Sequence, residues 1–596
     1  MDRKAIIVLA LSVALLFSWY FIVGRIFPPH PIPRNTNAVV LATNSAGSLT
    51  NQPSLSAATN LPPALSSGST NAVRPTQPEE TMVVTNSLAL YTFTSHGGGL
   101  KLVELLRYPQ RVACRGNTSQ TNTPAALNAS SSFPMLALPA NEALQGDGYF
   151  KLTRTATGVR AEKQLQSGLA IVKEFEPTSN YLVNASVRIE NRGAQPLAIP
   201  AQEWNVGTAG PMDETENEMF AGMLWFNGSS KTAIDQSWFM NHMMGCGCLP
   251  GSPRSEYVGG QNNVVWSEVH NQFFTMVLMP VQAANQVLGH KIDLPPPSPE
   301  VLKVNPRANL KPFGFQSSVV YAATNLPPNQ AIQRQFRLYA GPKENRVLER
   351  IALELKNEVD IVMGYTGPFG IFSKALLWAM NGLYSLGLSY ALAIISITVI
   401  IKLLFWPLTQ ASTRSMKRMA SLQPQMTAIR ERYKDDPAKM NRKMMEFMKE
   451  HKVSPLGGCL PMLLQIPVFI GFFTMVRSAI ELRGAQFLWA CDLSKPDTLF
   501  YIPGLNFPFN PLPLLMGVTM LWQARLTPPS PGMDPAQQRI MRYMPLIFLV
   551  ILYNYSAGLT LYWTVQNLLT IAQTKLTRAK DEAAAAKAPV PGRKNK

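Results

Sequence analysis

The chain has few cysteines for its length and too little patterning among them to predict a cysteine-based site. Five cysteines occur in 596 residues: Cys114, Cys246, Cys248, Cys459 and Cys491. Their spacing contains no CxxC pair and no zinc-finger pattern, so the sequence predicts neither a disulfide framework nor a structural zinc site. No cofactor or metal is expected elsewhere.

Two short motifs also lack the residues that would make them binding sites. Gly97, Gly98 and Gly99 are followed by no Lys-Ser/Thr pair and no helix start, so a tight turn is favoured over a phosphate-binding loop. The run HMMGCGC, from His242 to Cys248, gathers soft ligands that would suit copper. Its spacing matches no known ligand pattern, which favours an ordinary loop.

Acidic residues are also in deficit. The chain has 36 Asp and Glu against 54 Lys and Arg, a formal charge of +18. This excess favours contact with anionic lipid head groups or with ribosomal RNA, and it does not distinguish between them.

Two classes of function lack their usual sequence features. A secondary transporter that uses Lys402 as an ion or substrate site would normally show paired repeats, and the two halves of the chain show no self-similarity. A membrane-tethered periplasmic sugar enzyme would need a carboxylate and histidine constellation, which the spacing does not reveal. Both remain alternatives.

Long apolar runs, in contrast, are abundant. The first, from Ala5 to Gly24, follows Arg3 and Lys4, which predicts an N-terminus on the cytoplasmic side. It is longer than the apolar core of a signal peptide and has no small-residue cleavage site, so residues 1–27 are predicted to form an uncleaved anchor. Residues 28–80 are rich in Pro, Asn, Ser, Thr and Ala, and are predicted to be a disordered linker.

Residues 81–341 carry short alternating apolar and polar runs separated by Gly- and Asn-rich turns. This pattern predicts a large antiparallel β domain, a sandwich, which the preceding anchor would place outside the cytoplasm. Residues 342–387 then predict connecting helices. The second of these is amphipathic, with apolar residues at steps of three and four, and is expected to lie along the outer membrane interface: Phe369, Phe372, Leu376, Ala379 and Leu383. A buried core helix is the alternative.

Five further membrane spans are predicted within residues 388–576. They lie near Leu388–Thr409, Leu456–Val476, Phe507–Arg525, Met541–Tyr555 and Gly558–Leu576. Lys and Arg outnumber acids between the first two, and are scarce between Ser478 and Phe509, as the positive-inside rule requires. With the anchor, six spans place both termini in the cytoplasm and leave residues 577–596 as a basic tail.

Polar side chains interrupt these apolar spans. Lys402 is costly to place in lipid and is therefore a functional-site candidate, although a lysine near the end of a span can also snorkel to the interface. With Thr398 one turn away and Gln465 in the next span, it could line a hydrophilic groove open to the cytoplasm. The last span adds further polar residues: Thr564, Gln566, Asn567, Thr570 and Gln573. Hydrogen bonding between helices is the alternative reading of them.

Residues 410–455 form a predicted cytoplasmic helical hairpin, basic on one side and rich in methionine on the other. Asp436 and Pro437 provide the N-cap and first turn of its second helix. Methionine suits surfaces that accept many apolar sequences, so four methionines are predicted to contact clients: Met419, Met426, Met440 and Met444. Alternatively, the two helices pack only on each other.

Four motifs carry a family resemblance: WPLTQASTRSMKRMASLQPQM, SPLGGCLPMLLQIPVF, LMGVTM and MPLIF. They closely resemble the YidC/Oxa/Alb family of membrane protein insertases, densely from about Gly367 to Lys575. The layout is similar to that of the bacterial form, with an extra N-terminal span and a large periplasmic domain.

The resemblance implies a polytopic helical inner-membrane protein with a five-span insertase core and a periplasmic all-β supersandwich similar to sugar-mutarotase domains. It implies no enzymatic chemistry. Its expected partners are nascent inner-membrane proteins, the lipid bilayer, the Sec translocon and the ribosome. Family groove positions map onto Lys402, Thr398, Gln465, Trp563 and Asn567. Lys402 stands where the family has arginine, so the charge remains but the planar bidentate fork does not.

Overall fold

The computed structural model describes residues 75–112, 123–139, 142–241, 252–367, 369–451, 460–526 and 535–586. The predicted anchor (1–27), nearly all of the predicted linker (28–80) and the HMMGCGC run lie outside these residues. Thr70–Gly532 and Arg542–Lys596 form one compact unit, and every contact discussed below lies within it.

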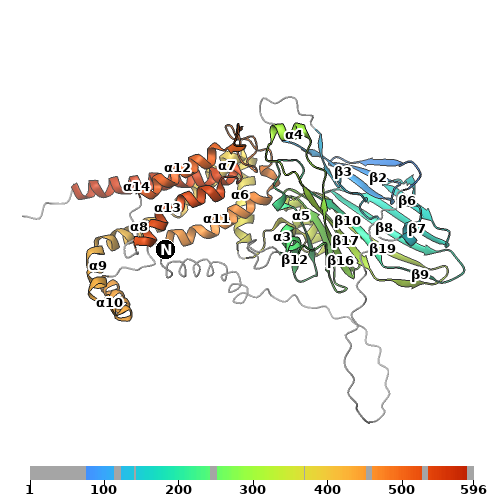
Figure 1. Ribbon diagram of the computed structural model, residues 1–596, viewed down its shortest axis with the longest axis horizontal. Helices are drawn as coiled ribbons and strands as arrows, with labels where there is room; N and C mark the ends of the chain where they lie inside the picture. The colour runs from blue at the N-terminus through green and yellow to red at the C-terminus, as the bar shows by residue number, and fades with distance from the viewer. Residues whose placement is uncertain are drawn as a thin grey trace, which may run out of the picture. The chain divides into compact units, whose positions relative to one another are not determined.

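Antiparallel sheets make up the part of the chain that the sequence predicts to be a β domain (Figure 1). One four-stranded sheet has the order β1-β2-β3-β4: β1 (Thr81–Thr85), β2 (Ala89–Thr94), β3 (Gly99–Pro109) and β4 (Pro124–Leu127). A second has the order β10-β17-β16-β13: β10 (Gln202–Ala209), β17 (Phe313–Tyr321), β16 (Gln286–Asp293) and β13 (Glu256–Gly259). A short pair joins β18 (Thr324–Leu326) to β9 (Leu197–Ile199).

The largest sheet has nine strands in the order β12-β11-β14-β15-β19-β8-β7-β6-β5. Their bounds are β12 (Lys231–Ile234), β11 (Gly222–Phe226), β14 (Trp266–His270), β15 (Phe274–Pro280), β19 (Ala331–Pro342), β8 (Leu182–Asn191), β7 (Leu169–Pro177), β6 (Val159–Gln164) and β5 (Lys151–Arg154). Short helices intervene: α2 (Glu142–Gln145), η1 (Glu218–Phe220), α3 (Gln236–Met240) and α4 (Pro299–Val304).

Both four-stranded sheets pack on the nine-stranded one. Phe93 of β2 contacts Phe175 of β7 with ring centroids 5.1 Å apart, and the Ser267 and Ser317 hydroxyls, from β14 and β17, hydrogen-bond at 2.8 Å. Burial follows from this layering: β8 alternates between buried and accessible residues, whereas β15 is buried throughout because both of its faces are covered. The predicted antiparallel β domain is confirmed.

The triple glycine after β2 forms the expected turn. Gly97 and Gly98 have φ of 76° and 54°, in the left-handed region that favours glycine. A Cβ atom on Gly98 would lie 2.5 Å from the Phe150 ring, so this position also lacks room for a side chain.

Helices dominate the rest of the chain. After α5 (Asn345–Leu355) and η2 (Val359–Met363) come α6 (Gly370–Ser385), α7 (Tyr390–Leu404), α8 (Trp406–Ser421), α9 (Gln423–Arg432), α10 (Pro437–Glu450) and α11 (Leu460–Ser478). The segment between α11 and α12 holds η4 (Ile480–Leu482), β20 (Phe500–Ile502) and β21 (Phe507–Phe509). The last helices are α12 (Pro511–Leu526), α13 (Pro535–Leu552) and α14 (Ala557–Ala586).

The helix bounds differ from the predicted spans in places. Residues Phe507–Phe509, placed in a span by sequence, form strand β21, and α14 continues to Ala586 through half of the predicted tail. Within the described ranges, no helix combines the length and apolarity that crossing a bilayer requires. The six spans therefore stay a prediction.

Helix α6 is amphipathic, but its buried face differs from the predicted stripe. Ser373, Leu376 and Met380 are buried, whereas Phe372 is 42% exposed. The face is rotated because α6 packs on α11, where the Ser373 hydroxyl bonds that of Thr474. The opposite face exposes Ile371, Trp378 and Leu386.

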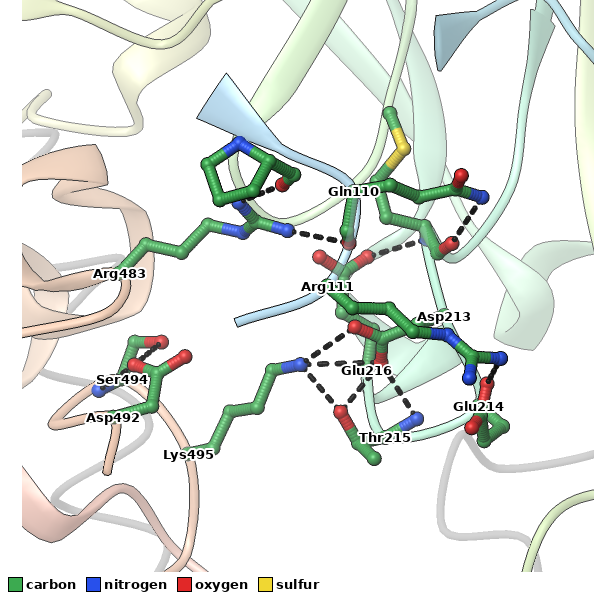
Figure 2. Close-up of polar contacts among 12 residues, drawn as sticks. Gln110, Arg111, Asp213, Glu214, Thr215, Glu216, Arg483, Asp492, Ser494 and Lys495 are labelled. Carbon is green, nitrogen blue, oxygen red and sulfur yellow. Dashed lines mark hydrogen bonds and ion pairs between the residues drawn. The ribbon is translucent and has the colours of Figure 1, made fainter. Parts of the chain in front are cut away.

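The segment from residue 479 to residue 510, here called the outer loop, contacts the β domain through two basic side chains (Figure 2). Lys495 Nζ lies 3.0 Å from Asp213 Oδ2, and the two side chains are only 13% and 4% exposed. Arg483 donates to the carbonyl oxygens of Pro109 (2.6 Å) and Gln110 (2.9 Å) at the end of β3.

The same loop also holds the start of α14. The backbone oxygen of Lys495 accepts from Ala557 N at 2.7 Å, and that of Leu493 accepts from Gly558 N at 2.8 Å. These bonds satisfy two amide groups that a helix N-terminus leaves without intrahelical partners. Lys495 therefore binds the β domain with its side chain and α14 with its backbone.

Cys491 in the outer loop is disulfide-bonded, and its partner lies outside the described residues. The spacing of the five cysteines gave no framework from which this bond could be predicted.

Glu216 is buried beside this ion pair, where it accepts a hydrogen bond from Met212 N at 2.8 Å. Burial, and next the charge of Asp213, raise the pKa of the Glu216 carboxyl to about 7. Burial would also raise the pKa of Asp213, but Lys495 and Thr215 outweigh it and lower that pKa.

We expect the free energy of unfolding of the β domain, where it contacts the outer loop, to fall as pH rises from 5 to 8. The folded state binds the Glu216 proton more tightly than the unfolded state does. The stabilisation from this proton is therefore complete below the ordinary carboxyl pKa and is lost as pH rises through about 7. The shift corresponds to a loss on the order of 3 kcal/mol. Glu216→Gln should reduce this dependence, whereas Glu300→Gln, at an exposed carboxylate, should leave it unchanged. Thermal unfolding of the full chain across this pH range measures the effect; parallel curves for wild type and Glu216→Gln would refute it.

Candidate functional site

Polar side chains on α14 connect this helix to α11, α7, α8 and α12. Gln465 Nε2 of α11 donates to the Tyr562 hydroxyl at 2.6 Å, and Gln566 Nε2 donates to Gln465 Oε1 at 3.2 Å. Nearer the C-terminus of α14, Gln573 Nε2 donates to the Thr409 hydroxyl of α8 at 2.8 Å. The residues fall on one side of α14 because they recur at steps of about four.

Lys402 belongs to this network. Its Nζ donates to the Thr570 hydroxyl at 2.8 Å, and the residue is only 9% exposed. Among the described residues no carboxylate pairs with Lys402. A lysine that merely snorkelled would direct its ammonium group to water, whereas that of Lys402 bonds a neighbouring helix. A role in a groove open to the cytoplasm stays a prediction.

The other predicted groove residues divide between this network and an apolar contact. Asn567 is buried and donates to the Thr519 hydroxyl of α12 at 3.2 Å. Thr398 is also buried, but its hydroxyl bonds the Ile394 carbonyl of its own helix at 2.7 Å. Trp563 packs against Phe469 and Phe548, with ring centroids 4.7 and 5.4 Å away, and so belongs to an aromatic cluster.

Three members of the network were missed by sequence reasoning, among them Thr409, whose hydroxyl accepts from Gln573. Tyr562 supplies the hydroxyl that Gln465 binds, and Thr519 binds Asn567. Tyr562 could have been found from its four-residue spacing to Gln566. Thr519 gave no comparable signal, because a single threonine in an apolar helix usually bonds its own backbone.

The network consists of groups that bind other polar groups through hydrogen bonds. It combines a cation, amides and hydroxyls whose bonds are mostly to one another, and Tyr562 stacks on Phe472 at 4.3 Å. Within the described ranges, no cluster of His, Cys, Asp and Glu could hold a metal ion.

The methionines of the predicted hairpin pack together. Met419, Met426, Met444 and Met448 form one buried cluster between α8, α9 and α10, whereas Met440 is partly accessible. Asp436 caps α10 by accepting from Lys439 N at 3.0 Å, which confirms that prediction. This arrangement is the one that the alternative reading describes, with the helices packed on each other; contact with clients stays a prediction.

Family models match nearly all of the described chain. A model described as "YidC periplasmic domain" matches residues 81–379, and one described as "60Kd inner membrane protein" matches residues 382–584. Their boundary falls within α6, between the β domain and the helices that carry the polar network.

Relatives match over the whole chain or over less than half of it. The membrane protein insertase YidC of Pelobacter propionicus is 30% identical over 603 residues, covering 96% of this chain and 98% of the relative. That of Cupriavidus necator is 44% identical over 265 residues, covering 44% of this chain and 45% of the relative. A crystal structure of an active YidC insertase is 18% identical, with a TM-score of 0.31 over 85% of this chain and 95% of that one. That TM-score is too low to support a statement about fold. The family models and the full-length match together show that the chain belongs to the YidC family of membrane protein insertases.

Proposed function

We propose that this insertase accepts the polar flank of a client between α7, α11 and α14, and passes its apolar segment into lipid beside these helices. The observation that carries the proposal is the buried cation of Lys402, which among the described residues is paired only with a neutral hydroxyl. A buried charge without a counter-ion favours an incoming group of opposite charge, because pairing offsets the cost of its burial.

The hydrogen-bond exchange should require little net energy. Gln465, Gln566 and Tyr562 satisfy one another when no client is present. A client's polar groups can replace these bonds one for one, so that neither partner is left unsatisfied at any step. The client's apolar segment then leaves for lipid, favoured by its own burial.

The proposed layout follows the sequence. Residues 1–27 anchor the chain, residues 28–80 form a linker, and the β domain lies in the periplasm. Residues 388–576 form the insertase core, with both termini and the hairpin (410–455) in the cytoplasm. The disulfide at Cys491 supports a periplasmic outer loop, since disulfides persist in oxidising compartments. Short helices such as α7, with 15 residues spanning about 22 Å, would thin the bilayer locally.

Partners beyond client and lipid are also proposals. The basic hairpin and the positive residues after Leu576 would suit ribosomal RNA, and they would equally suit anionic lipid beneath the last span. The Sec translocon is expected from the family resemblance. A transporter function is not favoured, since the relatives are insertases.

Site-specific photocrosslinking tests the proposed path of the client. A photoreactive residue at Gln566, within the network, should crosslink the polar tail of a ribosome-stalled client several-fold more than one at Leu568. Leu568 is a matched control because it lies two residues away on the same helix and is 44% exposed. Equal tail crosslinking from both positions, or a dominant yield from Leu568, would contradict the proposed path.

A further inference from the structure

A cavity of about 690 Å³ lies where the β domain meets α6 and the outer loop. Its walls come from the end of β3, the segment entering α5, the end of α6, the start of α7 and the region around η4. This volume is within the range of small-ligand sites. The cavity is separate from the polar network of α14, whose residues do not line it.

Four arginines line the cavity against two carboxylates. The arginines are Arg107, Arg111, Arg346 and Arg483, and the carboxylates are Glu344 and Glu481. Burial raises the pKa of both carboxyls. The cavity wall is therefore positively charged.

Much of this positive charge is available to a ligand. Arg111 pairs with Glu214 at 2.8 Å, but Arg107 and Arg346 are exposed and make no ion pair with any described residue. Arg483 has only the two carbonyl oxygens of Pro109 and Gln110 as acceptors, and its buried Nε has no partner among the described residues. Guanidinium groups are well suited to pairing with phosphate oxygens, because they carry a positive charge and several N–H donors.

The cavity is also lined by a hydrogen-bond acceptor. Asn381 Nδ2 donates to Glu481 Oε1 at 3.0 Å, while Glu481 Oε2 is buried with no donor among the described residues. That oxygen can accept a bond from a ligand hydroxyl. The cavity therefore presents donors for phosphate and an acceptor for an alcohol.

The helix α6, whose end lines the cavity, also exposes apolar residues. Tyr384 and Tyr390, both lining residues, stack in parallel with ring centroids 4.2 Å apart. Along α6, Ile371, Trp378 and Leu386 are 75%, 75% and 77% exposed. Exposed tryptophan and tyrosine beside aliphatic residues are typical of the head-group level of a bilayer.

We propose that this cavity binds a phosphate-bearing polyol: either the head group of an anionic phospholipid such as a phosphatidylglycerol, or a free polyol phosphate. The arginines hold the phosphate, and Glu481 accepts from a hydroxyl of the polyol. A head group bound here would tie the β domain and α6 to the membrane surface at one point.

Native mass spectrometry of the full chain released from vesicles tests the lipid source. One vesicle preparation contains phosphatidylglycerol, and the other contains only phosphatidylcholine. The free source is tested by calorimetric titration of the detergent-purified chain with glycerol 3-phosphate. Arg107→Gln/Arg346→Gln should bind the ligand at least tenfold more weakly than wild type. Arg350→Gln is the matched control, because Arg350 is an exposed arginine of α5 outside the cavity lining.

The mass spectrometry and the titration distinguish a lipid ligand from a free one. Retention of phosphatidylglycerol that the double variant loses and the control keeps identifies a lipid site, and a titration with the same variant pattern identifies a free polyol phosphate. The proposal is overturned if neither ligand binds, if phosphatidylcholine is retained equally, or if the double variant and the control lose binding to the same degree. Unchanged thermal unfolding of the double variant would show that its loss of binding is local.

Discussion

Lys402→Met is expected to slow the insertion of clients with acidic translocated tails by about tenfold or more. The substitution keeps the length of the side chain and removes a buried cation whose Nζ, within the part of the chain that the structure describes, bonds only Thr570. Loss of one favourable charge interaction of about 1.4 kcal/mol is sufficient for a tenfold change. Protease protection of the translocated tail in inverted membrane vesicles measures the rate.

Two controls isolate the charge. Lys402→Arg should retain most of the activity because the cation remains, and a client with a neutral tail should insert at similar rates in wild type and Lys402→Met. Thr570→Val should have a smaller effect than Lys402→Met, since the cation stays in place. If Lys402→Met inserts both clients at the wild-type rate, Lys402 serves only as an anchor and the proposed path fails.

Lys495→Met should release the outer loop from the β domain. It leaves Asp213 buried, with a side chain only 4% exposed, and without its cation. Removing one partner of a buried ion pair typically costs about 3–5 kcal/mol. Hydrogen exchange should therefore accelerate both in residues 212–216 and in the outer loop, as followed by mass spectrometry of the full chain.

Arg111→Gln is the matched control for this second prediction. It also breaks an ion pair at the junction, with Glu214, but the Arg111 side chain is 46% exposed and such pairs contribute at most about 1 kcal/mol. The double substitution Lys495→Met/Asp213→Leu should recover part of the protection, since no buried charge remains unpaired. Equal exchange in Lys495→Met and wild type would show that the ion pair does not hold the junction.

The sequence predicted features that depend on local periodicity. Alternation predicted the β domain, and three- and four-residue spacing predicted the methionine faces of the hairpin. Asp436 before Pro437 was sufficient to place the start of α10. These features are local because each depends on residues within a few positions of one another.

Contacts between distant segments could not be predicted in this way. Lys495 and Asp213 are 282 positions apart, and nothing in either segment indicates the other. The same holds for Lys402 and Thr570, 168 positions apart: each was recognised as unusual for an apolar helix, but their bond depends on how α7 packs on α14. The rotated face of α6 has the same cause, because packing against α11 decides which residues are buried.

Lys495 has a mechanical consequence. Its carbonyl holds the first amide of α14, a helix of 30 residues and about 45 Å that acts as a stiff rod. Its ammonium group forms the ion pair with Asp213 of the β domain. A force applied to that domain from outside would therefore pull on the end of the rod, and the strain would travel along its axis to Thr570 and the cation beside it.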